Sequence, residues 1–321
     1  MGERSKAEWV HAYLEQLRTQ RKLSPHTLDA YRRDLAELAA LSGETAWSAL
    51  AQADLRRYAA RLHGRELAPR SIARKLSGWR GFFDWLGGQN ALAANPAQGV
   101  RAPKRPKSLP KALSVDDAVR LVSTPARMHA PGTGAEDGII PGTAPEPAEL
   151  CNRAMFELLY SSGLRVSELA GLDLHYSPAA LGWLEQGNAD VTVLGKGGKR
   201  RTVPVGSAAM AAIGAWLAVR PAPADGSAAL FTSARGTRVS ARVVQLRLKA
   251  HGLATGAPSG VHPHMLRHSF ASHVLQSSGD LRAVQDMLGH ATIASTQVYT
   301  ALDFQHLAQV YDQAHPRAKI K

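Results

Sequence analysis

The sequence predicts a mainly α-helical protein of two domains, with a small β-hairpin in the second. Three observations support this prediction. The chain has 321 residues, which is more than one ordinary domain contains. Prolines and basic residues interrupt it near residue 100, and apolar residues recur at helical spacing over most of the remainder. A pair of short alternating runs, at 191–194 and 201–205, departs from that spacing and accounts for the β element.

Residues 1–100 form the first predicted domain, which is helical. Ser24 and Pro25 fit the N-cap and the first position of a helix, and the apolar residues that follow share one face. The stretch 69–86 repeats this pattern with a second apolar stripe. Three of its basic residues fall outside the stripe, where a solvated face and a DNA-facing surface fit about equally well: Arg70, Arg74 and Lys75.

Residues 101–111 form the predicted linker between the domains. Prolines at 103, 106 and 110 prevent regular structure and keep the segment extended. The segment also carries five basic residues, so we expect it to lie along phosphates. The candidate DNA contacts in the linker are Arg101, Lys104, Arg105 and Lys107.

Residues 112–321 form the second predicted domain. Ser114 and Asp117 stand in the relation of a capping box, which predicts the start of a helix. The stretch 124–149 is rich in proline and glycine and has no periodicity, so we expect a flexible insertion loop. Two helices follow, broken at 161–163, which places Arg165 at the start of the second helix.

The β-hairpin is predicted around GKGGKR, residues 195–200, because a Gly-Gly turn separates the two alternating runs. This segment does not fit a phosphate-binding P-loop, since Lys199 is followed by arginine and not by serine or threonine. What remains is a lysine, Lys196, near the hairpin tip, and for an isolated hairpin such a lysine is merely exposed. From Arg238 onward the pattern is helical again to the end of the chain.

The charge of the chain indicates a polyanionic partner. There are 39 Lys+Arg against 26 Asp+Glu, a formal net charge of +13. No apolar run approaches the roughly 20 residues that span a bilayer, and the N-terminus lacks the apolar core of a signal peptide. The single cysteine, Cys151, excludes internal disulfides and cysteine-based zinc sites, and its apolar neighbours predict a packed thiol. We therefore expect a soluble cytoplasmic protein.

Four histidines crowd the stretch HPHMLRHSFASH, residues 262–273. His264 and His268 are four residues apart and would share a helix face, as two zinc ligands do in zincins. Met265 follows the first of them in place of the zincin glutamate, and Arg267 would lie beside any bound cation. The stretch by itself leaves three interpretations open: a metal site, a phosphate site and a basic helix.

Six residues together supply the nucleophile and the positive charge that a metal-free phosphoryl-transfer site needs. The planar forks of Arg165 and Arg267 suit the non-bridging oxygens of a phosphodiester. Tyr299 would be a nucleophile if adjacent guanidinium groups favoured its phenolate. Taken singly, each arginine fits a structural salt bridge and the tyrosine a packing residue. The full set is Arg165, Lys196, His264, Arg267, His290 and Tyr299.

These same residues carry a resemblance to a known family. GLRVSEL (163–169), the lysine of GKGGK, HPHMLRH (262–268), LGH (288–290) and Tyr299 resemble, in this order, the motifs of the tyrosine recombinase (phage integrase) family. The resemblance extends over nearly the whole chain. Its further stretches resemble those members of the family that resolve chromosome dimers at cell division. Two stretches depart from the family pattern, and both are predicted as loops: 124–149 and 174–190.

The resemblance implies a helical, SAM-like core-binding domain followed by an α+β catalytic domain. It implies that Tyr299 attacks the scissile phosphate to form a 3′-phosphotyrosyl link, as in type IB topoisomerases, while Arg165 and Arg267 hold the non-bridging oxygens. Lys196 would protonate the leaving 5′-oxygen, with Lys199 as the alternative lysine. His264 would serve in proton transfer and His290 would bind the phosphate. Neither a metal nor ATP would be needed.

The resemblance also implies partners. They are double-stranded DNA with a recombination site, a second recombinase of the same family in a heterotetramer, and a DNA translocase. The tail helix, Leu302–Gln313, would dock on a neighbouring protomer, although packing on its own domain is the alternative. Of the histidines without a catalytic counterpart, His268 and His273 are predicted to be packing or capping residues, and His262 is predicted to position the turn before Pro263.

Three other functions remain open at this stage. A phage or integron integrase, or the partner recombinase itself, would share the site and differ in its DNA target. A DNA-binding module without catalysis would leave Tyr299 incidental. A histidine-dependent metallonuclease would lose cleavage in EDTA, whereas a tyrosine recombinase would not.

Overall fold

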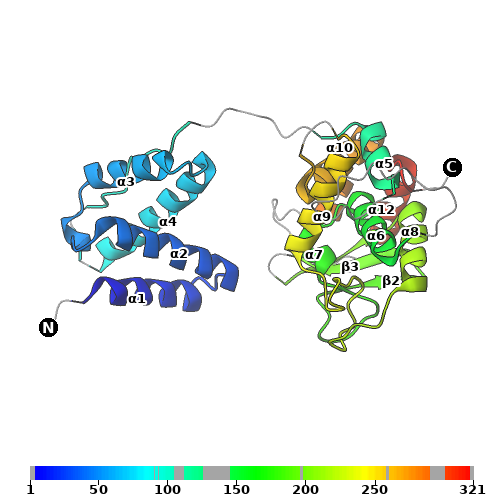
Figure 1. Cartoon of the computed structure of the whole chain (residues 1–321), viewed down its shortest axis with the longest axis horizontal. Coiled ribbons are helices and arrows are strands. Elements are labelled where there is room, and N and C mark those ends of the chain that lie inside the picture. Colours follow the sequence, from blue (N-terminus) through cyan, green and yellow to red (C-terminus); the bar gives the residue numbers. More distant parts are fainter. Residues whose placement is uncertain are drawn as a thin grey trace. The chain divides into compact units, whose positions relative to one another are not determined.

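The computed structural model describes residues 4–89, 91–92, 94–104, 112–125, 145–195, 198–257, 260–289 and 301–318. The chain divides into two compact units, Met1–Leu109 and Pro110–Lys321 (Figure 1). Five predicted site residues lie outside the described residues: Arg105, Lys107, Lys196, His290 and Tyr299.

The first unit is a bundle of helices around an aromatic core. Its elements are α1 (Lys6–Thr19), α2 (Pro25–Ser42), a 3₁₀ turn (Trp47–Ala49), α3 (Gln52–Gly64) and α4 (Pro69–Gly88). The Ser24 side chain accepts a hydrogen bond from the Thr27 N–H, so the predicted N-cap of α2 is confirmed. Trp79, Phe82 and Phe83 of α4 are fully buried, which confirms its predicted apolar stripe.

A buried carboxylate joins α2 to α4 in this unit. Asp34 is fully buried and forms ion pairs with Arg74 and with the Lys75 ammonium, the latter at 3.0 Å. Lys75 also pairs with Glu37 at 2.5 Å, and its side chain is 10% exposed. The prediction that Lys75 contacts DNA is therefore corrected, because its charge neutralises two carboxylates inside the unit. Helical spacing alone did not show that α2 presents carboxylates to this side of α4.

The second unit packs helices against a small sheet. The helices are α5 (Val115–Ser123), α6 (Pro147–Ser162), α7 (Val166–Ala170), α8 (Ser207–Val219), α9 (Ala241–Ala254), α10 (Pro263–Ser278), α11 (Leu281–Leu288) and α12 (Ala301–Ala314). The strands are β1 (Leu172–Asp173), β2 (Gly182–Glu185), β3 (Asp190–Leu194) and β4 (Arg200–Pro204), in the order β1-β2-β3-β4. Buried along nearly its whole length, α6 packs against α8 and α10 (Figure 1).

The predicted hairpin is confirmed as the antiparallel pair β3 and β4, with Val191 opposite Val203. The prediction of a loop over 174–190 is wrong, because β2 lies within it and pairs antiparallel with β3. Only Trp183 and Leu184 are large apolar residues in that strand, too few to show an alternating pattern in the sequence. The predicted insertion 124–149 ends inside α6, which begins at Pro147, and its residues 126–144 lie outside the described part.

The C-terminal helix α12 packs on its own unit in this structure. Leu307 and Tyr311 are buried, and the Tyr311 hydroxyl is 2.6 Å from the Ser161 hydroxyl of α6. Arg317, beyond the helix, forms an ion pair with buried Glu157 of α6. Docking of this helix on a neighbouring protomer stays a prediction, and it would require these contacts to be exchanged.

Two histidines of the sequence 262–273 are structural, as predicted. His262 caps α10, its Nδ1 accepting a hydrogen bond from the Met265 N–H. His273 is buried, with its Nε2 2.9 Å from the Leu113 carbonyl and its Nδ1 2.9 Å from the Tyr160 hydroxyl. Because a carbonyl only accepts, Nε2 carries the proton and Nδ1 accepts from the tyrosine. Among the described residues, no helix is long and apolar enough to cross a membrane.

Burial of His315 predicts a pH-dependent stability. Burial lowers the pKa of His315 to about 3, against an ordinary value of 6.5. Between pH 3 and pH 6.5, His315 binds a proton in the unfolded chain but stays neutral in the folded chain. The free energy of unfolding therefore falls as the pH drops below about 6.5. One such proton corresponds to about 1.4 kcal/mol for each pH unit. We expect His315→Phe to make this fall shallower in urea unfolding between pH 7.5 and 5.

The control for this measurement is His63→Gln, which changes an exposed histidine of the first unit. A decline in His315→Phe as steep as in the wild type would contradict the assignment. The Phe variant also loses the acceptor of the Arg317 N–H, so the slope, and not the absolute stability, is the quantity to compare.

Two glycines that end helices allow a matched test of packing at the end of α6. Gly163 and Gly279 both adopt a left-handed backbone, with φ of +57° and +67°. A Cβ at Gly163 would lie 2.4 Å from Cδ1 of Phe270, whereas a Cβ at Gly279 would meet nothing within 4 Å. We expect Gly279→Ala to cost about 1–2 kcal/mol through backbone strain. Gly163→Ala should lose about 1–3 kcal/mol more through overpacking. Equal losses in urea unfolding would contradict this account.

Candidate active site

Two arginines from different helices meet at one pocket. Arg165 is the N-cap of α7, and it follows the left-handed Gly163 that ends α6. Arg267 lies one turn into α10, close to His264 in sequence on the same helix. Both arginines and His264 line one pocket of about 420 Å³. The structure therefore brings together the described members of the predicted set.

Arg267 is anchored at the junction of three segments. Its side chain is buried, and its guanidinium donates to the carbonyls of Gly163 and Leu288, each at 2.6 Å. Burial lowers the pKa of Arg267 to about 10, and the neighbouring charges of Arg165 and Arg201 act in the same direction. The group still carries its charge at neutral pH, and its geometry is set by two carbonyls.

Arg165 is held by the glutamate one turn later. Its NH1 donates to Oε1 of Glu168 at 2.8 Å, and its main-chain N–H donates to Oε2 at 2.7 Å. The Arg165 side chain is 37% exposed, whereas that of Glu168 is 6% exposed. The arginine thus reaches from a buried carboxylate toward the pocket surface. This geometry suits a guanidinium that binds an anion from solvent.

Glu168 and Arg201 were missed by the sequence reasoning. Arg201 of β4 donates through both terminal nitrogens to the two Glu168 oxygens, each at 2.8 Å. Burial by itself would raise the pKa of Glu168, but the hydrogen bonds and charges of Arg201 and Arg165 outweigh burial and hold that pKa below its ordinary value. The available signal was strand alternation, which points Arg201 inward with Val203, where a lone charge would be costly.

Two described segments beside the pocket lead toward predicted residues outside the described part, Lys196 and His290. In the β3–β4 hairpin the Gly195 N–H donates to the Lys199 carbonyl at 2.7 Å, and Lys196 directly follows Gly195 in the sequence. Gly289 ends α11 with a left-handed backbone, directly before His290. Lys199, the alternative lysine, is exposed at the base of the turn.

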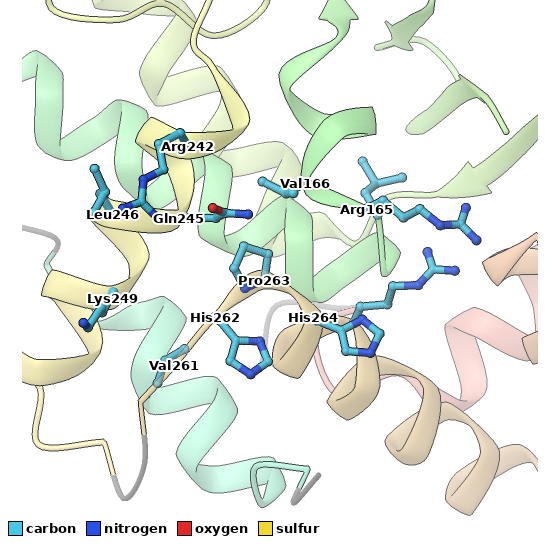
Figure 2. A pocket seen from close by; sticks show the side chains of 12 residues that line it. Arg165, Val166, Arg242, Gln245, Leu246, Lys249, Val261, His262, Pro263 and His264 are labelled. Atoms are coloured by element: carbon cyan, nitrogen blue, oxygen red, sulfur yellow. The ribbon is translucent and has the colours of Figure 1, made fainter. Parts of the chain in front are cut away.

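The pocket is basic and has a second wall. In Figure 2, Arg165 and His264 lie on one side, and Arg242, Leu246 and Lys249 of α9 lie on the other. The α9 residues are spaced three and four apart, which places them on one helix face. The described lining residues include four arginines and lysines and no carboxylate. Such a surface attracts a polyanion.

The predicted DNA contacts of the first unit have different environments. Arg70, Arg101 and Lys104 are exposed. The Arg74 side chain is 50% exposed, yet its guanidinium is bound to Asp34. Together with Lys75, it thus belongs to the ion-pair network between α2 and α4.

No group of three or more histidine, cysteine, aspartate or glutamate side chains among the described residues is arranged to hold a metal ion. Cys151 is buried, and burial raises the pKa of its thiol to about 11, so the prediction of a packed thiol is confirmed.

Comparison with known families gives two matches. The phage integrase family matches residues 137–306, and the N-terminal SAM-like domain of phage integrases matches residues 10–90. The first match spans the whole described pocket, from Arg165 to Arg267. The second spans most of the helical bundle that we described as the first unit.

Comparison with individual proteins agrees with these matches. Tyrosine recombinase XerC 1 of Ralstonia nicotianae is 54% identical, over 97% of this chain and 94% of its own. Tyrosine recombinase XerC of Pseudomonas aeruginosa is 47% identical, over 97% and 96% of the two chains.

Among solved structures, a lambda integrase dimer bound to a core site has a TM-score of 0.65 at 14% identity and covers 91% of this chain and 98% of that one. The Tn1549 transposon integrase in complex with circular intermediate DNA has a TM-score of 0.63 at 17% identity, covering 93% and 98%. These two likenesses concern the fold. The family matches and the extensive identity to the recombinases together show that this chain belongs to the phage integrase family, the tyrosine recombinases.

Proposed function

We propose that this chain is a XerC-like recombinase that cuts and rejoins DNA at a specific site through a 3′-phosphotyrosyl intermediate. The observation that carries the proposal is the convergence of Arg165 and Arg267 on one basic pocket, each with its guanidinium held in place by the protein. Two fixed guanidinium groups are suited to the two non-bridging oxygens of one phosphodiester.

The proposed chemistry uses fixed charge in place of a metal ion. Tyr299 attacks the phosphorus and displaces the 5′-oxygen, which takes a proton from Lys196. His264 moves the proton of the tyrosine, and His290 donates to the phosphate. Arg165 and Arg267 stabilise the charge that builds up on the phosphorane oxygens, and their hydrogen bonds to the protein avoid reorganisation during the step.

The reverse reaction reseals DNA without ATP. The phosphotyrosyl bond keeps the energy of the broken phosphodiester, so a 5′-hydroxyl from another strand can attack it directly. A strand exchange follows when that hydroxyl belongs to the partner duplex. This property distinguishes a recombinase from a nuclease, which hydrolyses the phosphodiester with water.

The partner of the pocket is double-stranded DNA. Support comes from the basic lining, from the α9 face beside the two arginines, and from the DNA core site named for the lambda integrase neighbour. We propose a dif-like site as the target, a XerD-like recombinase as the second subunit type of a heterotetramer, and regulation by an FtsK-like translocase in the cytoplasm. The names of the relatives, tyrosine recombinase XerC, support the recombinase activity that these proposed partners would serve.

A nicked suicide substrate tests the nucleophile. On a duplex that carries a dif-like site and a nick next to the scissile phosphate, the wild type should form an SDS-resistant protein–DNA adduct. Tyr299→Phe should form none, because it lacks the attacking oxygen, while it keeps its DNA affinity in a mobility-shift assay. The adduct should form equally well in EDTA. Loss of the wild-type adduct in EDTA would favour a metallonuclease, and no adduct at all on this substrate would overturn the proposal.

The salt dependence of DNA binding separates exposed from paired cations on α4. We expect Arg70→Ala to reduce the slope of log affinity against log salt by about 0.9, the value for one phosphate contact. Lys75→Met should leave the slope unchanged and lower the free energy of unfolding, because Asp34 and Glu37 lose a partner. A smaller slope in Lys75→Met with unchanged stability would contradict the structural assignment.

A further inference from the structure

Arg201 sits in the interior of the second unit, beside the proposed site but outside its pocket. It belongs to β4, opposite Val193 of β3, and its side chain is 5% exposed. Its two terminal nitrogens donate to the two oxygens of Glu168, and its Nε donates to the Met287 carbonyl at 2.8 Å. Every nitrogen of the guanidinium therefore has a protein acceptor.

The contacts of Arg201 join three segments that are far apart in sequence. Glu168 belongs to α7, whose N-cap is Arg165. Met287 belongs to α11, which ends at Gly289. A Cβ added at Gly289 would lie 3.0 Å from Cδ of Arg201, so the two residues are close neighbours. The strand of Arg201 is itself the second arm of the hairpin that leads from the GKGGK turn. Each segment leads to a residue of the proposed site.

The charges form an ordered chain from the interior to the pocket. Glu168 accepts both nitrogens of Arg201 on one side and NH1 of Arg165 on the other. If Arg165 were the single cationic partner of this buried carboxylate, the full negative charge of Glu168 would act on the Arg165 guanidinium. With Arg201 in place, the negative charge is shared, and Arg165 is oriented without being neutralised by Glu168 alone.

We propose that Arg201 is a positioning residue for strand cleavage. By pairing with Glu168 it balances part of that negative charge, so that Arg165 faces the scissile phosphate. Through its hydrogen bond to Met287 it also connects the β3–β4 hairpin to the end of α11. The inference rests on the proposed function, since cleavage is its readout. Arg201 itself does not line the pocket. Its effect on the reaction passes through Glu168 and through the Met287 carbonyl.

A double-mutant cycle tests this coupling. The variants are Arg201→Met, Glu168→Gln and the double variant, each assayed for the rate of adduct formation on saturating nicked substrate. Arg201→Met leaves the buried carboxylate to Arg165 and should lower the rate about 100-fold, as misplacement of a reacting group does. In the Glu168→Gln background there is no carboxylate to share, so Arg201→Met should lower the rate by about threefold at most.

Two further measurements separate positioning from a general loss of structure. Affinity for the intact duplex should stay within about twofold of the wild type in all variants, because no DNA contact changes. Arg201→Lys keeps one charge near Glu168 and should restore part of the rate. Because Lys is the milder change, it also carries the test if Arg201→Met does not fold, as judged by its urea midpoint.

Arg220→Met is the matched control. Arg220 is a partly buried arginine of the same unit that donates to the carbonyls of Leu230 and Ala229, with no contact to the proposed site. It should lose stability and keep the wild-type rate. Rate losses that multiply in the double variant, or a wild-type rate in folded Arg201→Met, would overturn the inference. Absence of an adduct with the wild type would instead overturn the proposed function.

Discussion

The buried carboxylate of Glu168 is the interaction on which the candidate active site depends. Its side chain is 6% exposed, and it is stable as an anion only because Arg165 and Arg201 both bind it. These two partners come from a helix N-terminus and from a strand of the sheet. One charge therefore sets the distance between α7 and β4, and with it the orientation of an arginine in the pocket.

The same arrangement recurs in the first unit with a different result. Asp34 is buried and shared between Arg74 and Lys75, so that a carboxylate of α2 joins two cations of α4. There both cations are used to join two helices. In the second unit one of the two cations, Arg165, also reaches the pocket. A shared buried carboxylate thus serves packing in one unit and packing together with anion binding in the other.

In the proposed function, the pocket acts on a phosphodiester with fixed charges. Arg267 is immobilised by the carbonyls of Gly163 and Leu288, and Arg165 by Glu168. Guanidinium groups held in this way do not have to be oriented during the reaction, which is the main advantage of a preorganised site over water. The α9 face across the pocket extends the basic surface beyond the reacting phosphate, as a long polyanion requires.

Much of this fold could be predicted from local sequence patterns. Helical periodicity, the Ser24 cap and the Gly-Gly turn predicted the main elements, because they depend on local spacing and backbone preference. The ordered motifs indicated the family, and the structure places Arg165, His264 and Arg267 around one pocket, while the catalytic roles of all six predicted residues stay predictions. Which charged side chains are available for binding could be seen only in the folded chain. Lys75 is committed to Asp34 and Glu37, and Arg201 completes the pair with Glu168. An ion pair depends on which segments distant in sequence become neighbours, and periodicity along one segment carries no information about that.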